Sequence, residues 1–90
     1  KVLPDGVVAY KRTPEFTAAT VPAGLLRSHD TKAGVWGVIV VLEGALLYRI
    51  LEPVIEEVRL DPSTRGIVEP TVKHEVAPES GVRFFVEFYR

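Results

Sequence analysis

Residues 29–44, HDTKAGVWGVIVVLEG, place a polar loop, an apolar strand and a turn in direct succession. The run from Val35 to Glu43 is apolar at nearly every position, which predicts a strand buried on both faces, inside a sandwich or at a subunit interface. Gly44 follows it at the point where a tight hairpin needs a residue with positive φ. This segment therefore predicts a β-fold with His29 in a loop at one end of its best strand.

Short strands are expected on both sides of this segment. Single Gly and Pro residues punctuate the chain throughout, a pattern typical of many short strands joined by turns. The expected strands and strand-like segments lie at residues 7–10, 16–21, 25–28, 45–52, 57–60, 66–70, 74–76 and 82–90. No alternation of strands with helices is visible, which disfavours an α/β fold and leaves a β-sandwich or a small barrel.

The segment at residues 51–58 allows two interpretations of its secondary structure. Leu51, Val54, Ile55 and Val58 stand at helical spacing, which is a template for a helical turn. Pro53 interrupts that stretch and its flanks are rich in β-formers, so a strand over residues 57–60 is the favoured interpretation and a helical turn is the alternative.

The last strand has two different faces. Its even positions form an uninterrupted apolar face, made by Val82, Phe84, Val86 and Phe88. Its odd positions are mixed, namely Arg83, Phe85, Glu87 and Tyr89. The mixed face is expected either to meet solvent and a partner subunit or to line a polar cavity.

Composition limits the classes of function. The 90 residues predict one domain over residues 1–90, with a core thin enough for a homodimer to be expected. The formal net charge is −1 and no basic run occurs, which argues against nucleic-acid binding and against electrostatic docking on a membrane. The longest apolar run is too short to span a bilayer. There is no cysteine and no signal-peptide pattern, which fits a cytoplasmic protein and excludes thiolate metal sites.

The two histidines are the candidate metal ligands. His29 and His74 are each expected where a strand meets a loop, and neutral imidazole is a common ligand of borderline metal ions. The alternative is that both are ordinary polar residues at strand ends. A third ligand is expected from Glu43, Glu75, Glu87 or Asp30. Glu87 fits best if the odd face of the last strand lines the cavity.

Three further residues are candidates for a ligand pocket. Trp36 would wall the pocket or, alternatively, anchor the core or a dimer. Lys32 would neutralise an anionic ligand or, alternatively, lie in solvent. Phe85 would contribute from the last strand. Neither a G-x-S-x-G elbow nor a Gly-rich phosphate loop is present, which argues against nucleophilic hydrolysis and against nucleotide binding.

Three motifs resemble the small cupin-like domain at the N-terminus of TehB-type tellurite-resistance proteins, and the stand-alone YeaR-type proteins. They are the run HDTKxGxWG over residues 29–37, the Leu42-x-Gly44 turn, and Glu69-Pro70 followed by His74. The resemblance implies an all-β, cupin-like double-stranded β-barrel, or jelly roll. It also implies a dimer, a divalent metal such as Zn, Fe, Mn or Ni, and a role in resistance or response to a toxic oxyanion or oxidant.

The chain departs from the general cupin pattern at two ligand positions. Thr31 stands where the pattern has a second histidine, and Gly37 stands where it has a glutamate. Only His29 and His74 match. Two functions therefore stay open: a metal-binding cupin that acts on or senses a small anionic or oxidant ligand, and a metal-free small-ligand-binding or dimerisation module without catalytic activity. A carboxylate directed at the two histidines would favour the first.

Overall fold

The structure, a computed structural model, describes residues 2–90. In this part of the chain the regular elements are eight strands and one short 3-10 helix. Their bounds are β1 Ala9–Arg12, β2 Phe16–Thr17, η1 Ala23–Leu26, β3 Trp36–Glu43, β4 Leu46–Ile50, β5 Glu56–Leu60, β6 Gly66–Val68, β7 His74–Pro78 and β8 Arg83–Tyr89. No helix of residues 2–90 has the length and apolar character that crossing a bilayer requires.

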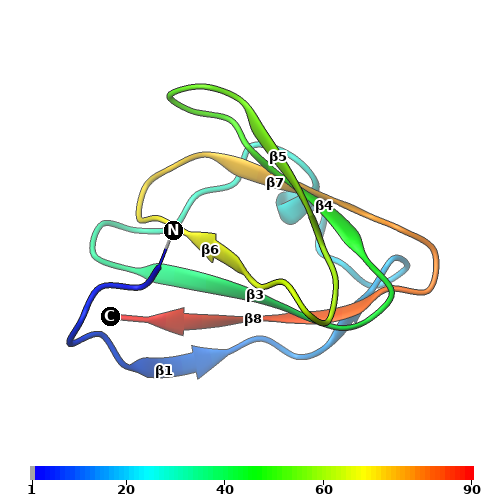
Figure 1. Cartoon of the computed structure of the whole chain (residues 1–90), viewed down its shortest axis with the longest axis horizontal. Helices are drawn as coiled ribbons and strands as arrows, with labels where there is room; N and C mark the ends of the chain where they lie inside the picture. Colours follow the sequence, from blue (N-terminus) through cyan, green and yellow to red (C-terminus); the bar gives the residue numbers. More distant parts are fainter. Residues whose placement is uncertain (1) are drawn as a thin grey trace.

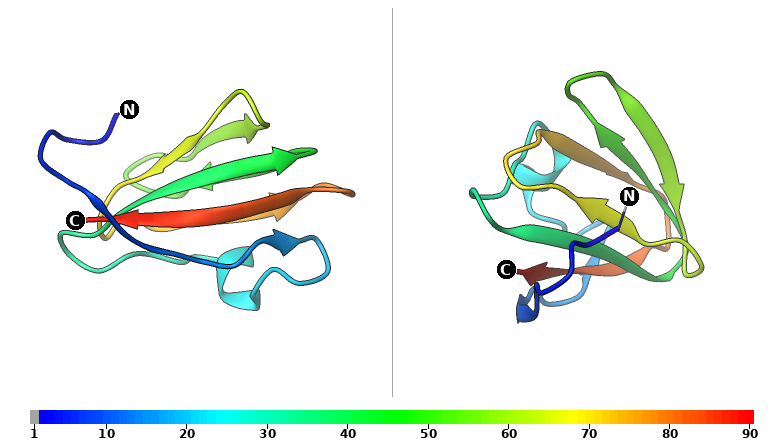
Figure 2. Two further views of the ribbon diagram at one scale, coloured as in Figure 1. Left: turned by 90° about the horizontal axis from the view of Figure 1, so that it is seen from below. Right: turned by 60° about the vertical axis from the view of Figure 1, so that its left-hand side comes forward.

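The strands form two antiparallel sheets that face each other (Figures 1 and 2). The larger sheet has the order β1-β8-β3-β6, with the short β2 also paired to β8. The smaller sheet has the order β5-β4-β7. This arrangement confirms the expected all-β fold, and β3, β4, β5, β6 and β8 lie close to their expected positions.

The core fills the space between the sheets because alternate residues of each strand point inward. In the larger sheet Ile39 lies opposite Val86 and Val41 opposite Phe84, so the even positions of β8 face the core. In the smaller sheet the inward side chains include Leu46 and Tyr48 of β4. The other face of β3 is also covered at Val38, which is 2% exposed, as its continuous apolar run predicts.

Two sequence expectations differ from the structure at local turns. Residues 25–28 are not a strand, because the Leu25 N–H donates to the Pro22 carbonyl and closes the turn of η1. The segment at residues 16–21 is a strand only over Phe16–Thr17, after which the Val21 N–H donates back to the Thr17 carbonyl. At the segment with two interpretations the favoured one agrees with the structure, since residues 51–55 contain no helical turn and β5 spans Glu56–Leu60.

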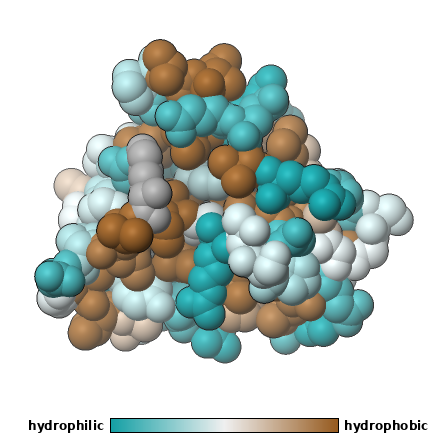
Figure 3. Space-filling view, viewed as in Figure 1, coloured by the Kyte–Doolittle hydropathy of each residue, from teal (hydrophilic) through white to brown (hydrophobic). Residues whose placement is uncertain are grey.

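The apolar residues at helical spacing have another location. Val54 and Ile55 are 64% and 63% exposed, at the projecting turn between β4 and β5. Figure 3 shows apolar side chains at the top of the molecule, where this turn projects. The helical spacing of these apolar residues therefore does not correspond to a buried face of a helix.

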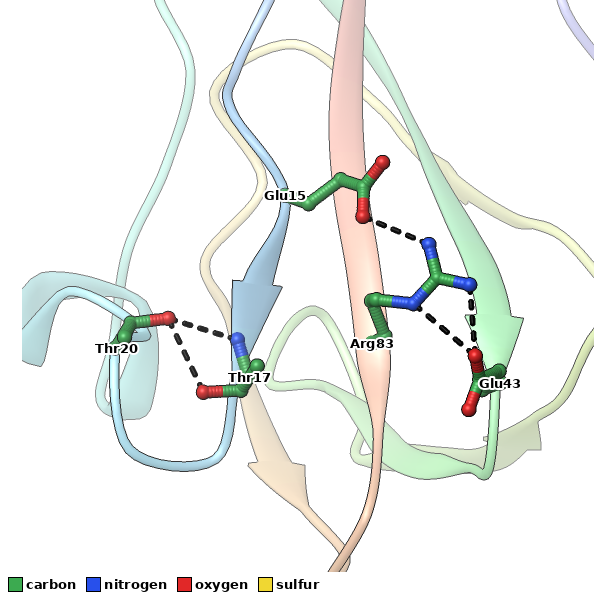
Figure 4. Close-up of polar contacts among 5 residues, drawn as sticks. All are labelled: Glu15, Thr17, Thr20, Glu43 and Arg83. Atoms are coloured by element: carbon green, nitrogen blue, oxygen red, sulfur yellow. Dashed lines mark hydrogen bonds and ion pairs between the residues drawn. The ribbon is translucent and has the colours of Figure 1, made fainter.

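Arg83 connects three parts of the larger sheet at one end of β8 (Figure 4). Its guanidinium lies 2.7 Å from a carboxylate oxygen of Glu15, before β2, and 2.8 Å from a carboxylate oxygen of Glu43, at the end of β3. A turn closed by Thr20, whose hydroxyl accepts a bond from the Thr17 N–H, lies nearby. Exposed ion pairs contribute little to stability. We therefore assign to this cluster mainly the role of holding the segment before β2 and the end of β3 against β8.

Candidate functional site

The candidate site is a cavity of about 310 Å³ between the two sheets, which we call the inner cavity. Its walls are mostly apolar side chains of the strands, with both histidines of the chain among the lining residues. Representative lining residues are His29, Ile39, His74, Val76, Phe84 and Val86. Gly37 also lines it, and a Cβ added there would lie 3.2 Å from the Val68 Cβ, so the missing side chain permits close packing at this wall.

The fold brings His29 and His74 together although 44 residues separate them (74 − 29 − 1). Their backbones form an isolated antiparallel bridge, in which each N–H donates to the other carbonyl at 2.7 and 2.8 Å. Their ring centroids lie 5.4 Å apart with an interplanar angle of 86°. The structure therefore brings the two histidines side by side.

His74 is the more enclosed of the two. It begins β7, is 4% exposed, and packs edge-on against the ring of Tyr48 at a centroid distance of 5.9 Å. Its Nδ1 lies 3.1 Å from the Val72 carbonyl oxygen. A carbonyl only accepts hydrogen bonds, so Nδ1 carries the proton and a neutral ring leaves the Nε2 lone pair available.

Burial lowers the pKa of His74 below its ordinary value, and the nearby His29 adds to that effect. The bond from Nδ1 to Val72 and the charge of Asp30 act in the opposite direction but do not outweigh burial. His74 is therefore a neutral imidazole near pH 7, suited to accept a hydrogen bond or to bind a metal ion.

We expect the free energy of unfolding to decrease as the pH falls below about 6.5, the ordinary pKa of histidine. The reason is that His74 has its pKa lowered in the folded state, so in this window the unfolded chain binds more protons. The stabilisation is fully present above the unfolded pKa and is lost as the pH falls to the folded pKa. Urea unfolding of wild type and His74→Gln at successive pH values would measure it.

The difference in pH dependence between the two proteins reports on His74 together with its electrostatic coupling to His29, because the remaining titrating groups are shared. An NMR titration of the His74 ring in the folded wild type provides an independent check. A ring that titrates at or above the ordinary pKa, or equal pH slopes for both proteins, would contradict the expectation.

The metal-ligand set is incomplete around the two histidines. A metal bound at about 2.1 Å by both imidazoles would place the ring centroids about 5–6 Å apart, so the observed spacing fits two ligands of one ion. Across residues 2–90, however, no group of three His, Asp or Glu side chains is arranged to hold a metal. The donor set is thus one protein ligand short of a typical catalytic zinc site.

Glu87 does not supply the third ligand in this structure. It lies on the outer face of the larger sheet, opposite Val38 of β3, because the even positions of β8 occupy the inner face. Its carboxylate accepts bonds from Arg12 at 3.0 Å and from the Tyr89 hydroxyl at 2.8 Å. These two bonds lower the pKa of Glu87.

The other expected third ligands also have partners elsewhere. Glu43 is paired with Arg83, and Glu75 lies 3.4 Å from the Arg49 guanidinium. The Asp30 carboxylate lies 3.8 Å from the Lys73 ammonium.

The expected pocket residues divide between two faces. Phe85 and Trp36 are absent from the walls of the inner cavity, because their strand positions point to the outer face of the larger sheet. There Phe85 packs under the Arg12 guanidinium, 4.2 Å from the ring centroid, and Trp36 lies opposite Tyr89. The assignment of Phe85 and Trp36 to the ligand pocket is therefore wrong, because the alternation of side chains along β3 and β8 places both on the outer face.

Lys32 lies beside His29 but is not among the residues that line the inner cavity. It lines a second cavity of about 220 Å³, which we call the outer cavity and which adjoins the inner one at His29. The sequence interpretation missed Lys11 and Thr13, which come from the segment of β1 and line the inner cavity. The apolar even positions of β8 did indicate two other lining residues, Val86 and Phe88, which point into the inner cavity.

Comparison with known proteins places the chain in a family. The model of the TehB-like domain family matches residues 11–86. The probable S-adenosyl-L-methionine-dependent methyltransferase TehB of Haemophilus influenzae is 35% identical over 74 residues, covering 78% of this chain and 26% of that protein. A second Haemophilus influenzae strain has a TehB with the same coverage and 32% identity.

Two solved structures are similar to this one. The crystal structure of TehB from Haemophilus influenzae has a TM-score of 0.86 and 31% identity, covering 94% of this chain and 32% of that one. A protein of Escherichia coli K12 has a TM-score of 0.89 over 100% of this chain and 96% of its own, and its 20% identity supports likeness of fold alone. The chain thus spans about a quarter to a third of the TehB proteins it matches. By sequence and by fold, the chain belongs to the TehB-like domain family.

Proposed function

We propose that this chain is a small-ligand-binding module whose ligand occupies the inner cavity beside His29 and His74. The observation that carries the proposal is the cavity itself, about 310 Å³ of mainly apolar space with two adjacent imidazoles. Ligand sites in proteins typically have this size and this composition, with a few polar groups that orient the ligand. We place this module ahead of a metal-dependent one because, among residues 2–90, no third side chain completes a metal-ligand set around the two histidines.

The polar groups suit recognition of a ligand that donates a hydrogen bond. The neutral His74 ring presents Nε2 as an acceptor, while its Nδ1–H is committed to Val72. The backbone of His74 is held by the bridge to His29, and its ring packs between the rings of His29 and Tyr48. The Tyr48 hydroxyl donates to the Ile67 carbonyl at 3.0 Å and so connects the two sheets behind it. A fixed acceptor in an apolar cavity gives orientation without reorganisation.

We also propose a setting for this binding, namely a response to a toxic oxyanion or oxidant in the cytoplasm, with the module acting as a homodimer. Membership of the TehB-like family supports the setting. The relatives that carry this domain within a longer chain are described as probable S-adenosyl-L-methionine-dependent methyltransferases. In such a chain the module would bind a small molecule and leave the group transfer to the rest of the protein.

Indole is a suitable probe, because it is neutral, flat and carries one N–H donor. We expect saturable binding to wild type, with the imidazole nitrogen resonances of His74 shifting in ¹⁵N-histidine NMR. Val86→Phe should weaken binding about tenfold or more, equivalent to about 1.4 kcal/mol, because the larger ring fills the inner cavity.

Val40→Phe is the matched control. It makes the same substitution in the same sheet, but Val40 lies opposite Phe85 on the outer face. It should leave indole affinity unchanged. Absence of saturable binding to a folded wild type, or equal loss in both variants, would refute the proposed site.

A divalent metal held by His29 and His74 is the second candidate function, favoured by the 5.4 Å ring spacing. The two imidazoles would hold the ion, and the ion would supply a Lewis acid to an anionic ligand. Elemental analysis after purification without chelator, then after loading with Zn, Fe, Mn or Ni, measures the occupancy. Near-stoichiometric metal that disappears in a His29→Gln/His74→Gln variant would support this candidate. Equal metal content in both proteins would refute it.

A further inference from the structure

We infer that the ligand of the inner cavity is an amphiphilic monoanion, with a compact apolar body in the inner cavity and its anionic group in the outer cavity. The inference rests on the proposed function and adds the chemical class of the ligand. It follows from the way two cavities of different character meet at His29.

The two cavities share a boundary. Four residues line both of them, namely Lys11, His29, Thr31 and Phe88. The inner cavity is walled by core side chains of both sheets, whereas the outer one is bounded by β1 and by the loop of residues 29–32. A ligand that spans this boundary meets apolar walls at one end and a polar loop at the other.

The outer cavity carries unneutralised positive charge. Lys11 and Lys32 both line it, and neither forms an ion pair within residues 2–90. Among the described residues, the carboxylate that lines it belongs to Asp30, which lies 3.8 Å from the ammonium of Lys73. Two lysines against one partly neutralised carboxylate favour an anionic group.

The loop that forms the outer cavity is held in place by its own hydrogen bonds. The Thr31 hydroxyl donates to the Val35 carbonyl at 2.8 Å, and the Val35 N–H donates to the Lys32 carbonyl at 3.0 Å. The Thr71 N–H donates to the Thr31 carbonyl at 3.0 Å, which ties the loop to the approach of β7. A loop fixed in this way requires little ordering when an anion binds.

The volumes set the size of the ligand. A dry, apolar protein cavity of about 150 Å³ accepts benzene. The inner cavity has about twice that volume, which corresponds to an apolar body of up to about ten non-hydrogen atoms. A medium-chain carboxylate has this size and charge and is the simplest probe of them. An aromatic acid with a ring N–H or hydroxyl has the same size and charge, and would in addition donate a hydrogen bond to Nε2 of His74.

Three probes separate the parts of this inference. Octanoate has both head and tail, 1-octanol has the tail without the charge, and acetate has the charge without the tail. NMR titration of wild type at low salt should show octanoate binding about fivefold to tenfold more tightly than 1-octanol, as expected for two exposed charge contacts. Acetate should not bind saturably. Raising the salt should reduce the preference for octanoate over 1-octanol.

The lysines are tested by a variant matched in net charge. Lys11→Gln/Lys32→Gln should remove the preference for octanoate and leave 1-octanol affinity unchanged. Arg49→Gln/Arg59→Gln, altered on the outer surface of the smaller sheet, removes the same charge far from the cavities and should keep the preference.

The outcomes distinguish this inference from the proposed function. Equal affinity for octanoate and 1-octanol, or an unchanged preference in the lysine variant, overturns the anionic class while the cavity stands as a binding site. Saturable acetate binding as tight as that of octanoate overturns the need for an apolar body. If octanoate, 1-octanol and indole all fail to bind the folded wild type, the proposed function itself is refuted.

Discussion

Phe84→Ala is expected to lower the free energy of unfolding by about 3–5 kcal/mol, the largest single-residue effect that we predict for this chain. Phe84 is 0% exposed and is the second residue of β8, opposite Val41 of β3. Its ring packs edge-to-face on Phe16 at a centroid distance of 5.7 Å. Truncation would remove this contact and enlarge the inner cavity that Phe84 already lines, so the neighbouring side chains have little means to close the gap.

Urea unfolding followed by circular dichroism measures the change, with the slope of the transition checked for two-state behaviour. Tyr10→Ala is the matched aromatic control, because Tyr10 is 40% exposed and its ring contacts the Arg90 guanidinium at 3.9 Å. That variant should lose about 1 kcal/mol or less. A Phe84→Ala protein within about 1 kcal/mol of wild type would show that this ring is not central to the core.

Much of the larger sheet was predictable because its strands carry strong patterns. The continuous apolar run before Gly44 specifies a strand covered on both faces, and the alternation in residues 82–90 specifies its neighbour. The segments that differ are those whose local hydrogen bonds compete with strand pairing. At η1 the Leu25 N–H bonds locally to Pro22, and no periodicity in so short a segment reveals this choice.

The paired histidines were predictable in position, because each was expected at a strand end and matched the family motif. The assignments of Glu87 and Phe85 failed for a different reason. In a strand the side-chain period is two, so choosing the wrong parity moves every residue to the opposite face. The odd face of β8 contains Phe85 as well as Glu87, and this mixed character left the choice open, although the even face is wholly apolar.

Lys11 shows a third reason why part of the site could not be predicted from the sequence. It lies near His29 only because β1 pairs with the C-terminal half of β8, where Lys11 is opposite Phe88. That pairing joins segments from the two ends of the chain. A local sequence pattern contains no information on which distant strand will be the partner, so the cationic side of the outer cavity became visible only in the folded structure.

Gly44→Ala is expected to lower the free energy of unfolding by about 2–4 kcal/mol, the second largest effect, from backbone strain and steric overlap together. Gly44 has φ +68° in the hairpin between β3 and β4, a conformation that costs a residue with a Cβ about 1–2 kcal/mol. In addition, the new Cβ would lie 3.0 Å from the Val82 Cα and 3.1 Å from the Gly81 carbonyl oxygen. Both are backbone atoms, so relief requires the turn before β8 to move.

Gly81→Ala separates the two causes. Gly81 also has a positive φ of +82°, but a Cβ there would meet no atom within 4 Å. It should therefore show the backbone strain alone, about 1–2 kcal/mol, and the difference between the two variants measures the steric overlap. Chemical denaturation of both proteins under the same conditions gives that difference. Equal losses would mean that the hairpin and the turn before β8 separate freely, and that the close approach at Gly44 does not fix the register between β3 and β8.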